Sequence, residues 1–331
     1  MNCFIVKLLS CYIIINVKKL DCAICGKKQK IKGLYPARFS QKKLNSSIFS
    51  ARRIPDGTHF CLVRCQNCGL IFSNPILPQK QINTYYTGSD FTYGEESEYL
   101  KKTYGKLLSL VIASGAKQSP TGTEIASGFA NPRNDRMKLL DIGCGNGFFL
   151  EVALRLGIRN LYGIEPGISS IQKARPTVRK KIKQGIFKKG MYKKNFFDIV
   201  TCFQTLDHVT SPTTFLRDIK EVLKTGGIVL FVVHNTDGLS VKLLGEKSPI
   251  FDIEHIYLFN KKSLKLLFAK HGFKNVQVFD VKNTYPLGYW TRMFPIPQFL
   301  KQPLMFLFKI TKAGTIPFAL SAGNIGITAE K

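Results

Sequence analysis

Residues 138–149 read Lys-Leu-Leu-Asp-Ile-Gly-Cys-Gly-Asn-Gly-Phe-Phe, and they carry the clearest structural pattern in the chain. An apolar run leads into three glycines, and a helical pattern follows them, so the stretch predicts a buried strand, a tight loop and a helix. Glycines at 143, 145 and 147 let the backbone pass close to a ligand where any side chain would collide with it. The amide-rich end of the helix points at the same loop. The sequence therefore predicts a ligand site at this turn.

Two acidic residues accompany the glycine loop. Asp141 stands two residues before Gly143, and Glu165 ends the next predicted strand, 24 positions beyond Asp141. The spacing G-x-G-x-G departs from the G-x-G-x-x-G of dinucleotide sites, and an acid beside the loop would repel a pyrophosphate. A cationic sulfonium ligand with an amino group would be attracted instead. A carboxylate at the end of the second strand can accept hydrogen bonds from ribose hydroxyls.

Strands and helices alternate along the rest of this half of the chain. We expect further strands near 181–186, at 197–203, 228–233 and 276–281, and helices at 213–223 and 263–271. This alternation predicts an α/β fold with a parallel sheet, whose ligand lies at the carboxyl ends of the strands.

The order of these motifs resembles class I S-adenosylmethionine-dependent methyltransferases over residues 137 to about 280. The resemblance rests on Asp141-Ile-Gly-Cys-Gly-Asn-Gly, Glu165, Phe197-Asp-Ile-Val, Leu206-Asp-His-Val-Thr-Ser-Pro and Leu223-Lys-Thr-Gly-Gly. It implies a doubly wound, mostly parallel, seven-stranded Rossmann-like sheet and S-adenosyl-L-methionine as cofactor. The implied cofactor residues are Asp141, Gly143, Cys144, Gly145 and Gly147 for the methionine portion, Glu165 for the ribose, Gly185 and Ile186 for the adenine, and Gln204 after the fourth strand. The acid that such proteins often carry at the end of the third strand is absent.

Methyl transfer from a sulfonium is an in-line displacement, so a base is needed only if the acceptor has a proton to lose. His208 follows the fourth strand, beside the expected methyl group, and is the predicted catalytic residue. Its alternative role is to order the loop by hydrogen bonding. His255 and Tyr257 either face the acceptor pocket or pack in the core, and His234 ends the fifth strand as a weaker candidate.

The cysteines predict a metal site ahead of this domain. Cys22-x2-Cys25 and Cys65-x2-Cys68 each end in a glycine, and two such turns supply four thiolates for a structural zinc ion in a small zinc-ribbon-like module. The 39 residues between the pairs require a looped insertion. A redox-active Cys-x-x-Cys is the alternative, although one redox motif would not require a second pair. Cys61 and His59 are expected to be bystanders.

The acceptor is less well defined by the sequence. The cysteine module and the stretch Glu254-His-Ile-Tyr-Leu-Phe are similar to bacterial methyltransferases associated with cell-surface saccharide biosynthesis, which implies a small-molecule or saccharide acceptor. Residues 173–194 hold ten Lys or Arg and no acid, in a chain whose formal charge is +28, so an RNA methyltransferase is the alternative. The fourth strand lacks the Asn-Pro-Pro-aromatic sequence of base-amino methylases. A non-catalytic scaffold is the third hypothesis.

We divide the chain into five segments: 1–20, an apolar leader read as a non-native upstream extension; 21–104, the zinc-binding module; 105–136, a linker or insertion; 137–284, the methyltransferase domain; and 285–331, an apolar tail with a final antiparallel strand. The tail is interpreted as a lid or a cover for the sheet, with contact to an anionic membrane surface as the alternative. Without a convincing secretory leader, and with cysteines gathered near a metal site, a cytoplasmic location is expected.

Overall fold

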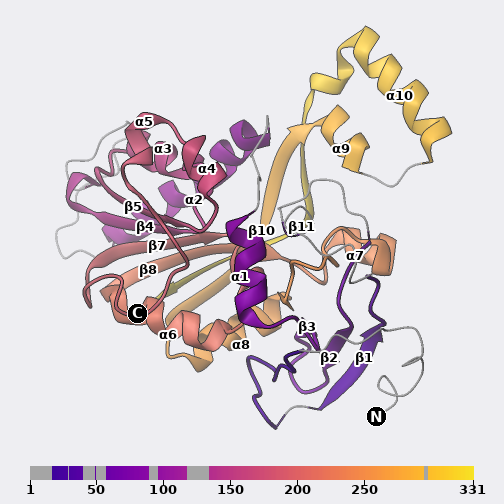
Figure 1. Ribbon diagram of the computed structural model, residues 1–331. Helices are drawn as coiled ribbons and strands as arrows, with labels where there is room; N and C mark the ends of the chain where they lie inside the picture. The colour runs from indigo at the N-terminus through magenta and orange to yellow at the C-terminus, as the bar shows by residue number, and fades with distance from the viewer. Residues whose placement is uncertain are drawn as a thin grey trace.

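The computed structural model describes residues 17–28, 30–39, 49, 57–88, 96–117, 134–293 and 297–331. Most of the predicted leader lies outside these residues. Seven described strands form the central sheet in the order β10, β11, β8, β7, β4, β5, β6 (Figure 1). Their bounds are Lys274–Pro286 (β10), Pro317–Glu330 (β11), Leu223–His234 (β8), Phe197–Phe203 (β7), Lys138–Ile142 (β4), Asn160–Glu165 (β5) and Ile182–Gln184 (β6).

The sheet is mixed but mostly parallel. Neighbours from β8 to β6 run parallel, and β11 is antiparallel to both β8 and β10. The predicted α/β fold is confirmed. Within β4, Leu139 and Leu140 belong to different core clusters, because successive side chains of a strand point to opposite faces. Both faces of the sheet are therefore buried.

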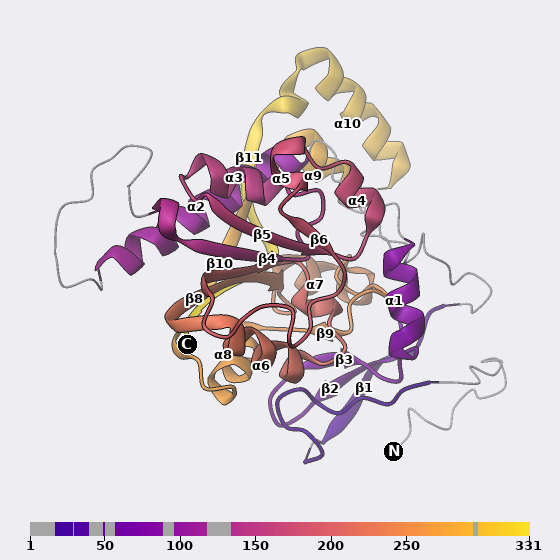
Figure 2. The same cartoon turned by 60° about the vertical axis from the view of Figure 1, so that its left-hand side comes forward.

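Helices cover the two faces of the sheet (Figure 2). One face packs against α6 (Pro212–Val222) and α8 (Lys261–Lys270), and the other against α2 (Glu96–Lys117), α3 (Phe148–Arg155) and α5 (Pro176–Arg179). The remaining described helices are α1 (Gln79–Thr87), α4 (Ile168–Gln172), α7 (Leu239–Leu244), α9 (Leu287–Met293), α10 (Gln298–Thr311) and the short 3₁₀ turns η2 (Asn134–Arg136), η3 (Leu206–His208), η4 (Gly245–Lys247) and η5 (Ala313–Thr315).

A second sheet joins the amino-terminal module to the other half of the chain. It has the order β1 (Ile31–Tyr35), β2 (Leu62–Cys65), β3 (Ile71–Ser73) and β9 (Tyr257–Leu258). The Oη of Tyr257 also donates to the carbonyl of Asp21 at 3.0 Å. Apolar side chains of the module belong to the same core cluster as α6 and α8. The module is thus built into the main fold, which its sequence position alone did not indicate.

The predicted linker over 105–136 begins inside a helix. α2 runs from Glu96 to Lys117, and its buried side chains Leu100, Tyr104, Leu108 and Val111 recur at helical spacing. They pack against the sheet face that α3 also covers. The linker prediction was wrong for 105–117, because this apolar stripe outweighs the small residues near its end. Residues 118–133 lie outside the described part.

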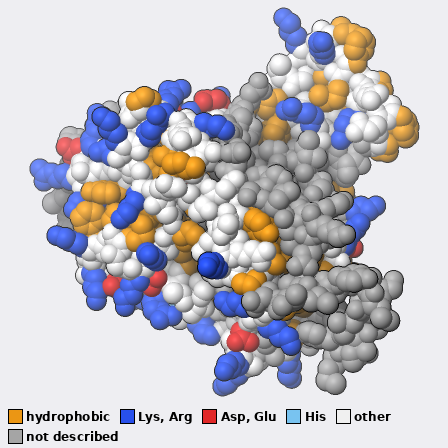
Figure 3. Space-filling view, viewed as in Figure 1, with side chains coloured by type: hydrophobic (Ala, Val, Ile, Leu, Met, Phe, Trp, Pro, Cys, Tyr) orange, Lys and Arg blue, Asp and Glu red, His pale blue; other side chains and the backbone are white. Residues whose placement is uncertain are grey.

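The tail forms a lobe on an extended ribbon. β10 and β11 pair from Lys274 and Glu330 out to Pro286 and Pro317, whereas β11 pairs with β8 only over 324–330. The predicted final strand is therefore in place. The lobe of α9 and α10 stands away from the sheet and shows apolar and basic side chains (Figures 1 and 3). No side chain of α10 is fully buried, so this helix does not cover the sheet, and the interpretation of the tail as a lid stays a prediction. No described helix is long and apolar enough to cross a bilayer.

Candidate functional site

The glycine loop turns sharply at the carboxyl end of β4. Gly143, Gly145 and Gly147 have φ of 74°, 54° and 73°, in the left-handed region that favours glycine. A Cβ on Gly143 would lie 2.2 Å from the Oγ1 of Thr205, which follows β7. The loop therefore passes so close to the end of β7 that only glycine fits.

Asp141 lies beneath this loop and is fully enclosed. The Oγ1 of Thr201 donates to its Oδ1 at 2.8 Å. Burial raises the pKa of Asp141 to about 8, since a charge without water is costly, and the nearby Glu165 adds to the effect. The site thus holds a buried acid whose charged form a cationic ligand would stabilise.

Glu165 connects β5 to the glycine loop. Its carboxylate accepts from the Gly145 amide at 2.9 Å and from the Gly167 amide at 2.8 Å. Burial raises the pKa of Glu165, and the two amides oppose that shift. The Glu165 carbonyl accepts from the Gly185 amide at 2.9 Å, so the predicted ribose and adenine residues are adjacent. The side chain of Ile186 is 44% exposed.

The two other predicted cofactor residues, Gln204 and Cys144, differ in whether a polar side-chain atom is left for the ligand. Gln204 has φ of 48°, and its buried side-chain oxygen has no hydrogen-bond partner among the described residues. Cys144 is buried, with its Sγ turned toward Gly163 of β5. Burial raises the pKa of the Cys144 thiol, which keeps it neutral. The unpartnered side-chain oxygen of Gln204 and the close-packed glycine loop fit a polar ligand that can donate hydrogen bonds. S-adenosylmethionine, with its amino and hydroxyl groups, is such a ligand.

A histidine cluster lies beyond the ends of β7 and β8, formed by Asp207, His208, His234 and His255. The Nδ1 of His234 donates to the buried Oδ2 of Asp207 at 2.6 Å. Burial raises the pKa of Asp207, but the hydrogen bond and charge of His234 outweigh it, so this pKa lies well below its usual range. Asp207 is therefore a buried carboxylate that orients an imidazole.

The other two imidazoles are fixed through their Nδ1 atoms. The Nδ1 of His208 is 2.8 Å from the Oη of Tyr86, which belongs to α1, and that of His255 is 2.7 Å from the carbonyl of Ile250. Burial lowers the pKa of both His208 and His255. The His255 ring lies 4.9 Å from that of His208 and 4.5 Å from that of His234, between ring centroids. The cluster thus holds neutral imidazoles beside one oriented by a carboxylate.

Asp207, His234 and His255 also place potential metal-ligating atoms within 4.8 Å of one another. Tetrahedral ligands about 2.1 Å from a metal ion lie about 3.4 Å apart. The 2.6 Å contact between Asp207 and His234 is too short for two ligands of one ion and is a hydrogen bond. We therefore treat the cluster as acid–base groups.

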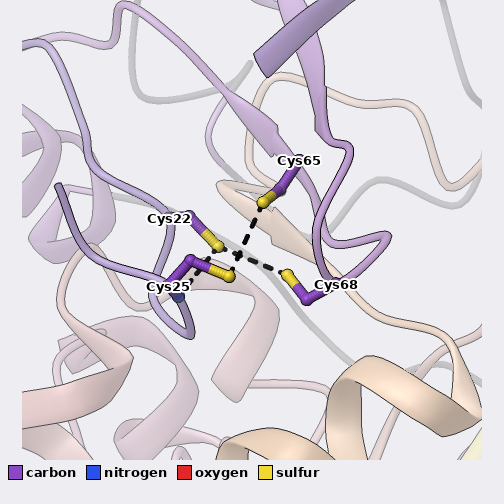
Figure 4. A group of neighbouring side chains, drawn as sticks. All are labelled: Cys22, Cys25, Cys65 and Cys68. Atoms are coloured by element: carbon purple, nitrogen blue, oxygen red, sulfur yellow. Dashed lines mark hydrogen bonds between the residues drawn. The ribbon is translucent and has the colours of Figure 1, made fainter. Parts of the chain in front are cut away.

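Four cysteines converge in the amino-terminal module (Figure 4). The sulfurs of Cys22 and Cys68 are 3.5 Å apart and those of Cys25 and Cys65 are 3.8 Å apart, and all four fit within one group. Sulfurs bound to one tetrahedral zinc at about 2.3 Å lie about 3.8 Å apart, so the arrangement fits this ion. His59 hydrogen-bonds Phe60 and Glu246 and Cys61 lies outside the group, as expected of bystanders.

Sequence reasoning missed Tyr86 and Asp207 as partners of the histidines. It also allowed Tyr257 to face the acceptor, but this side chain packs on Phe72 in the module, which was its alternative role. The dipeptide Asp207-His208 was visible, yet the partner of Asp207 is His234 on another strand. Only the three-dimensional fold brings these groups together.

Comparison with known proteins decides the domain type. Residues 123–278 match the family model of the methyltransferase domain. This stretch, a little under half of the chain, is therefore similar to a methyltransferase domain, and it contains Asp141, the glycine loop and Glu165. S-adenosylmethionine is the cofactor of that family.

Two curated relatives illustrate the range of this domain. A tRNA U34 carboxymethyltransferase of Campylobacter hominis is 27% identical over 154 residues, 44% of this chain and 54% of that protein. A ubiquinone biosynthesis O-methyltransferase of Colwellia psychrerythraea is 28% identical over 108 residues, 30% of this chain and 42% of that protein. The chain thus spans about half the length of these relatives.

Solved structures show similar chains at low identity. A phosphoethanolamine N-methyltransferase 2 of Haemonchus contortus, solved with S-adenosyl-L-methionine, aligns with a TM-score of 0.46 at 15% identity, over 79% of this chain and 62% of that one. A putative methyltransferase of Bacillus halodurans aligns with a TM-score of 0.40 at 19% identity, over 59% and 92%.

Proposed function

We propose that this protein transfers a methyl group from S-adenosylmethionine to a small-molecule or saccharide acceptor. The observation that carries the proposal is the hydrogen bond from the Gly145 amide to Glu165, which joins the glycine loop and the predicted ribose acid into one site. A carboxylate oxygen has lone pairs to spare, so Glu165 can also accept from ribose hydroxyls. Asp141 then lies near the cationic part of the ligand.

The cofactor would be held by this chain's loop, acids and amide. Gly143, Gly145 and Gly147 would admit the methionine portion, and Gly185 with Ile186 would contact the adenine. Gln204 offers an unpartnered oxygen to an amino group. When bound, S-adenosylmethionine supplies a methyl group already activated for displacement. The chain's own contribution is alignment and exclusion of water.

The histidine cluster supports a role in proton transfer from the acceptor. A hydroxyl or amino acceptor loses its proton as its oxygen or nitrogen bonds to the methyl carbon, whose bond to sulfur breaks. His208 remains a candidate to take that proton. The Asp207–His234 pair is better arranged, because the buried carboxylate fixes the Nδ1 hydrogen, leaves Nε2 free as acceptor and would stabilise the imidazolium.

With an acceptor found by screening, His234→Gln is expected to lower kcat by about 10²–10⁴-fold, as loss of a general base does. Binding of S-adenosylhomocysteine should be unchanged, because His234 lies outside the glycine loop. The same two measurements on His208→Gln show which histidine contributes more to kcat. Equal and small losses in both variants would remove the cluster from proton transfer.

An RNA acceptor is the second candidate. The similarity to a tRNA U34 carboxymethyltransferase supports it, as do the ten Lys or Arg of residues 173–194, several of them exposed between the end of α4 and β6 and in the turn after β6. Binding through phosphates weakens steeply with salt, whereas a neutral saccharide or small molecule is bound with little salt dependence. Methyl-acceptor assays at low and high salt therefore separate the two classes.

We also propose that Cys22, Cys25, Cys65 and Cys68 bind a structural zinc ion. A closed set of four thiolates leaves no open position for substrate. The sulfurs of Cys22 and Cys68 lie 3.5 Å apart and those of Cys25 and Cys65 lie 3.8 Å apart, which supports four thiolates around one ion. The ion would stabilise the module that carries Tyr86 toward His208.

Calorimetric titration with S-adenosylmethionine and S-adenosylhomocysteine tests the cofactor proposal. The matched variants are Gly143→Ala and Gly190→Ala: both positions have positive φ, but a Cβ on Gly190 meets nothing within 4 Å. Gly143→Ala is expected to weaken binding by at least about 30-fold, roughly 2 kcal/mol, and Gly190→Ala by less than about 3-fold. Glu165→Gln, which keeps the side-chain shape, should also weaken binding. Zinc-loaded, folded wild-type protein that binds neither compound would overturn the proposal.

A further inference from the structure

The lobe formed by α9, α10 and their ribbon concentrates exposed apolar side chains. Of the fifteen large hydrophobic side chains exposed in the described chain, seven lie between residues 299 and 318. Five of them are on α10, with exposed fractions between 52% and 74%: Phe299, Leu300, Phe306, Leu307 and Ile310. Single exposed hydrophobic residues need no explanation, but a contiguous group on one helix marks an interaction surface.

These five side chains share one side of the helix. With successive residues about 100° apart, they fall within about 120° of the circumference. Met305 and Phe308 lie outside this arc, are half-buried, and line a cavity with Tyr289 of α9. The helix is therefore fixed to α9 by its inner side and presents the apolar stripe outward.

Positive charge accompanies the stripe. Residues 281–329 contain five basic residues and no acidic one. These are Lys282, Arg292, Lys301, Lys309 and Lys312. None of the five forms an ion pair within the described part of the chain. An apolar stripe on a lobe whose charged residues are all basic complements a surface of negative headgroups above acyl chains.

The lobe is also placed so that its stripe is accessible. Before Asn324, β11 pairs with β10 but not with β8, and α10 stands clear of the central sheet in both ribbon views (Figures 1 and 2). Trp290 and Tyr289 pack against Tyr285 at the base of the lobe, and the Nε1 of Trp290 donates to the carbonyl of Phe318. Such aromatic residues favour the level of the headgroups.

We propose that α10 binds the surface of an anionic lipid bilayer, with its apolar stripe among the acyl chains and its lysines at the headgroups. The contact lies in the plane of the membrane, since no described helix is long and apolar enough to cross one. The proposal does not depend on methyl transfer. It assigns the tail a partner that is distinct from cofactor and acceptor.

Vesicle flotation and fluorescence test this contact on the full chain. Trp290 is the single tryptophan, so its emission reports directly on the lobe. Vesicles of phosphatidylcholine mixed with phosphatidylglycerol are expected to bind the protein and shift the emission to the blue, and pure phosphatidylcholine to bind at least about tenfold more weakly. The double variant Phe306→Ser with Leu307→Ser should lose binding. Its control, Leu110→Ser with Leu243→Ser, changes two leucines 59% and 62% exposed elsewhere and should bind normally.

Charge is tested by Lys309→Gln with Lys312→Gln, against the exposed lysines of the control Lys180→Gln with Lys183→Gln. Each lobe lysine removed should weaken binding about fivefold. Equal effects of the two charge variants, or no binding to anionic vesicles by any of these proteins, would overturn the proposal. So would a lipid-free dimer that Phe306→Ser with Leu307→Ser dissociates, because a second copy would then cover the stripe. Unchanged circular dichroism and thermal unfolding show that each variant is folded.

Discussion

Two halves of the same sheet edge are built in different ways. The half proposed to bind the cofactor (the cofactor half), at the ends of β4 and β5, takes its polar groups from residues 141–167, and backbone amides satisfy Glu165. The histidine cluster, at the ends of β7 and β8, joins side chains from α1, η3, β8 and the turn before β9. The first half is a local motif and the second is a long-range assembly.

This difference decides how each half is supported. A strand, a loop and the next strand place Asp141 and Glu165 with little help from the rest of the chain. Tyr86 reaches His208 only because the amino-terminal module is anchored on the main domain. Ser73 of β3 donates to the carbonyl of His255 at 3.0 Å, and Tyr257 donates to Asp21. We therefore expect damage to the module to affect the histidine cluster more than the cofactor half.

Loss of the proposed zinc ion should have the largest effect. Cys65→Ser is expected to release one zinc ion per chain and to unfold the module, because structural zinc contributes on the order of 10 kcal/mol to small metal-dependent folds. Amide hydrogen exchange should rise in β1, β2, β3 and near His255. Affinity for S-adenosylhomocysteine, measured by calorimetry, should change less than about threefold, as expected for distant sites.

Cys61→Ser is the matched control for that change. Cys61 lies a few residues from Cys65 but outside the sulfur group, so zinc content and exchange should stay at wild-type levels. Metal analysis of both proteins gives the comparison directly. If cofactor affinity disappears together with the zinc, the two halves are not supported separately and the contrast drawn between them is wrong.

The buried carboxyl group of Asp141 should make the stability of the cofactor half depend on pH. The pKa of Asp141 is raised to about 8 by burial, so between about pH 4 and pH 8 the folded protein keeps a proton that the unfolded chain has released. This group therefore lowers stability as pH rises through that window. Asp141→Asn should stabilise the ligand-free protein by on the order of 2 kcal/mol at pH 8 and hardly at all near pH 4.

Thermal unfolding at both pH values checks the sign of this effect. Glu165, Cys144 and Cys202 are the titratable groups that interact with Asp141, and they remain in place. The control Asp135→Asn changes an exposed carboxyl and should shift stability by less than about 0.5 kcal/mol. The same Asp141→Asn protein should bind S-adenosylmethionine more weakly. Lower stability at pH 8 would mean that Asp141 is structural.

The contrast also explains what the sequence could predict. The glycines, Asp141 and Glu165 were readable because their roles depend on neighbours within one βαβ unit, and the cysteine pairs because each turn is local. The pairing of β9 with β3 and the contact of Tyr86 with His208 join segments more than 100 residues apart. No spacing rule encodes such contacts, since they follow from how helices and sheets pack. The linker prediction failed although the signal was local. The apolar stripe of α2 continues at helical spacing to Val111, within the range assigned to the linker.

The smallest expected effect concerns a single hydroxyl group, that of Tyr86, through which the amino-terminal module contacts His208. Tyr86→Phe removes the group that contacts the Nδ1 of His208 at 2.8 Å and the carbonyl of Glu254, and should cost about 1 kcal/mol of stability. Tyr85→Phe removes the neighbouring hydroxyl, which accepts only an exposed contact from Gln81, and should cost much less. Nitrogen chemical shifts of the His208 ring should move only in Tyr86→Phe, because its Nδ1 loses a partner. A ring signal unchanged in that variant would show that the module does not reach the cluster through Tyr86, and support would then rest on β9 alone.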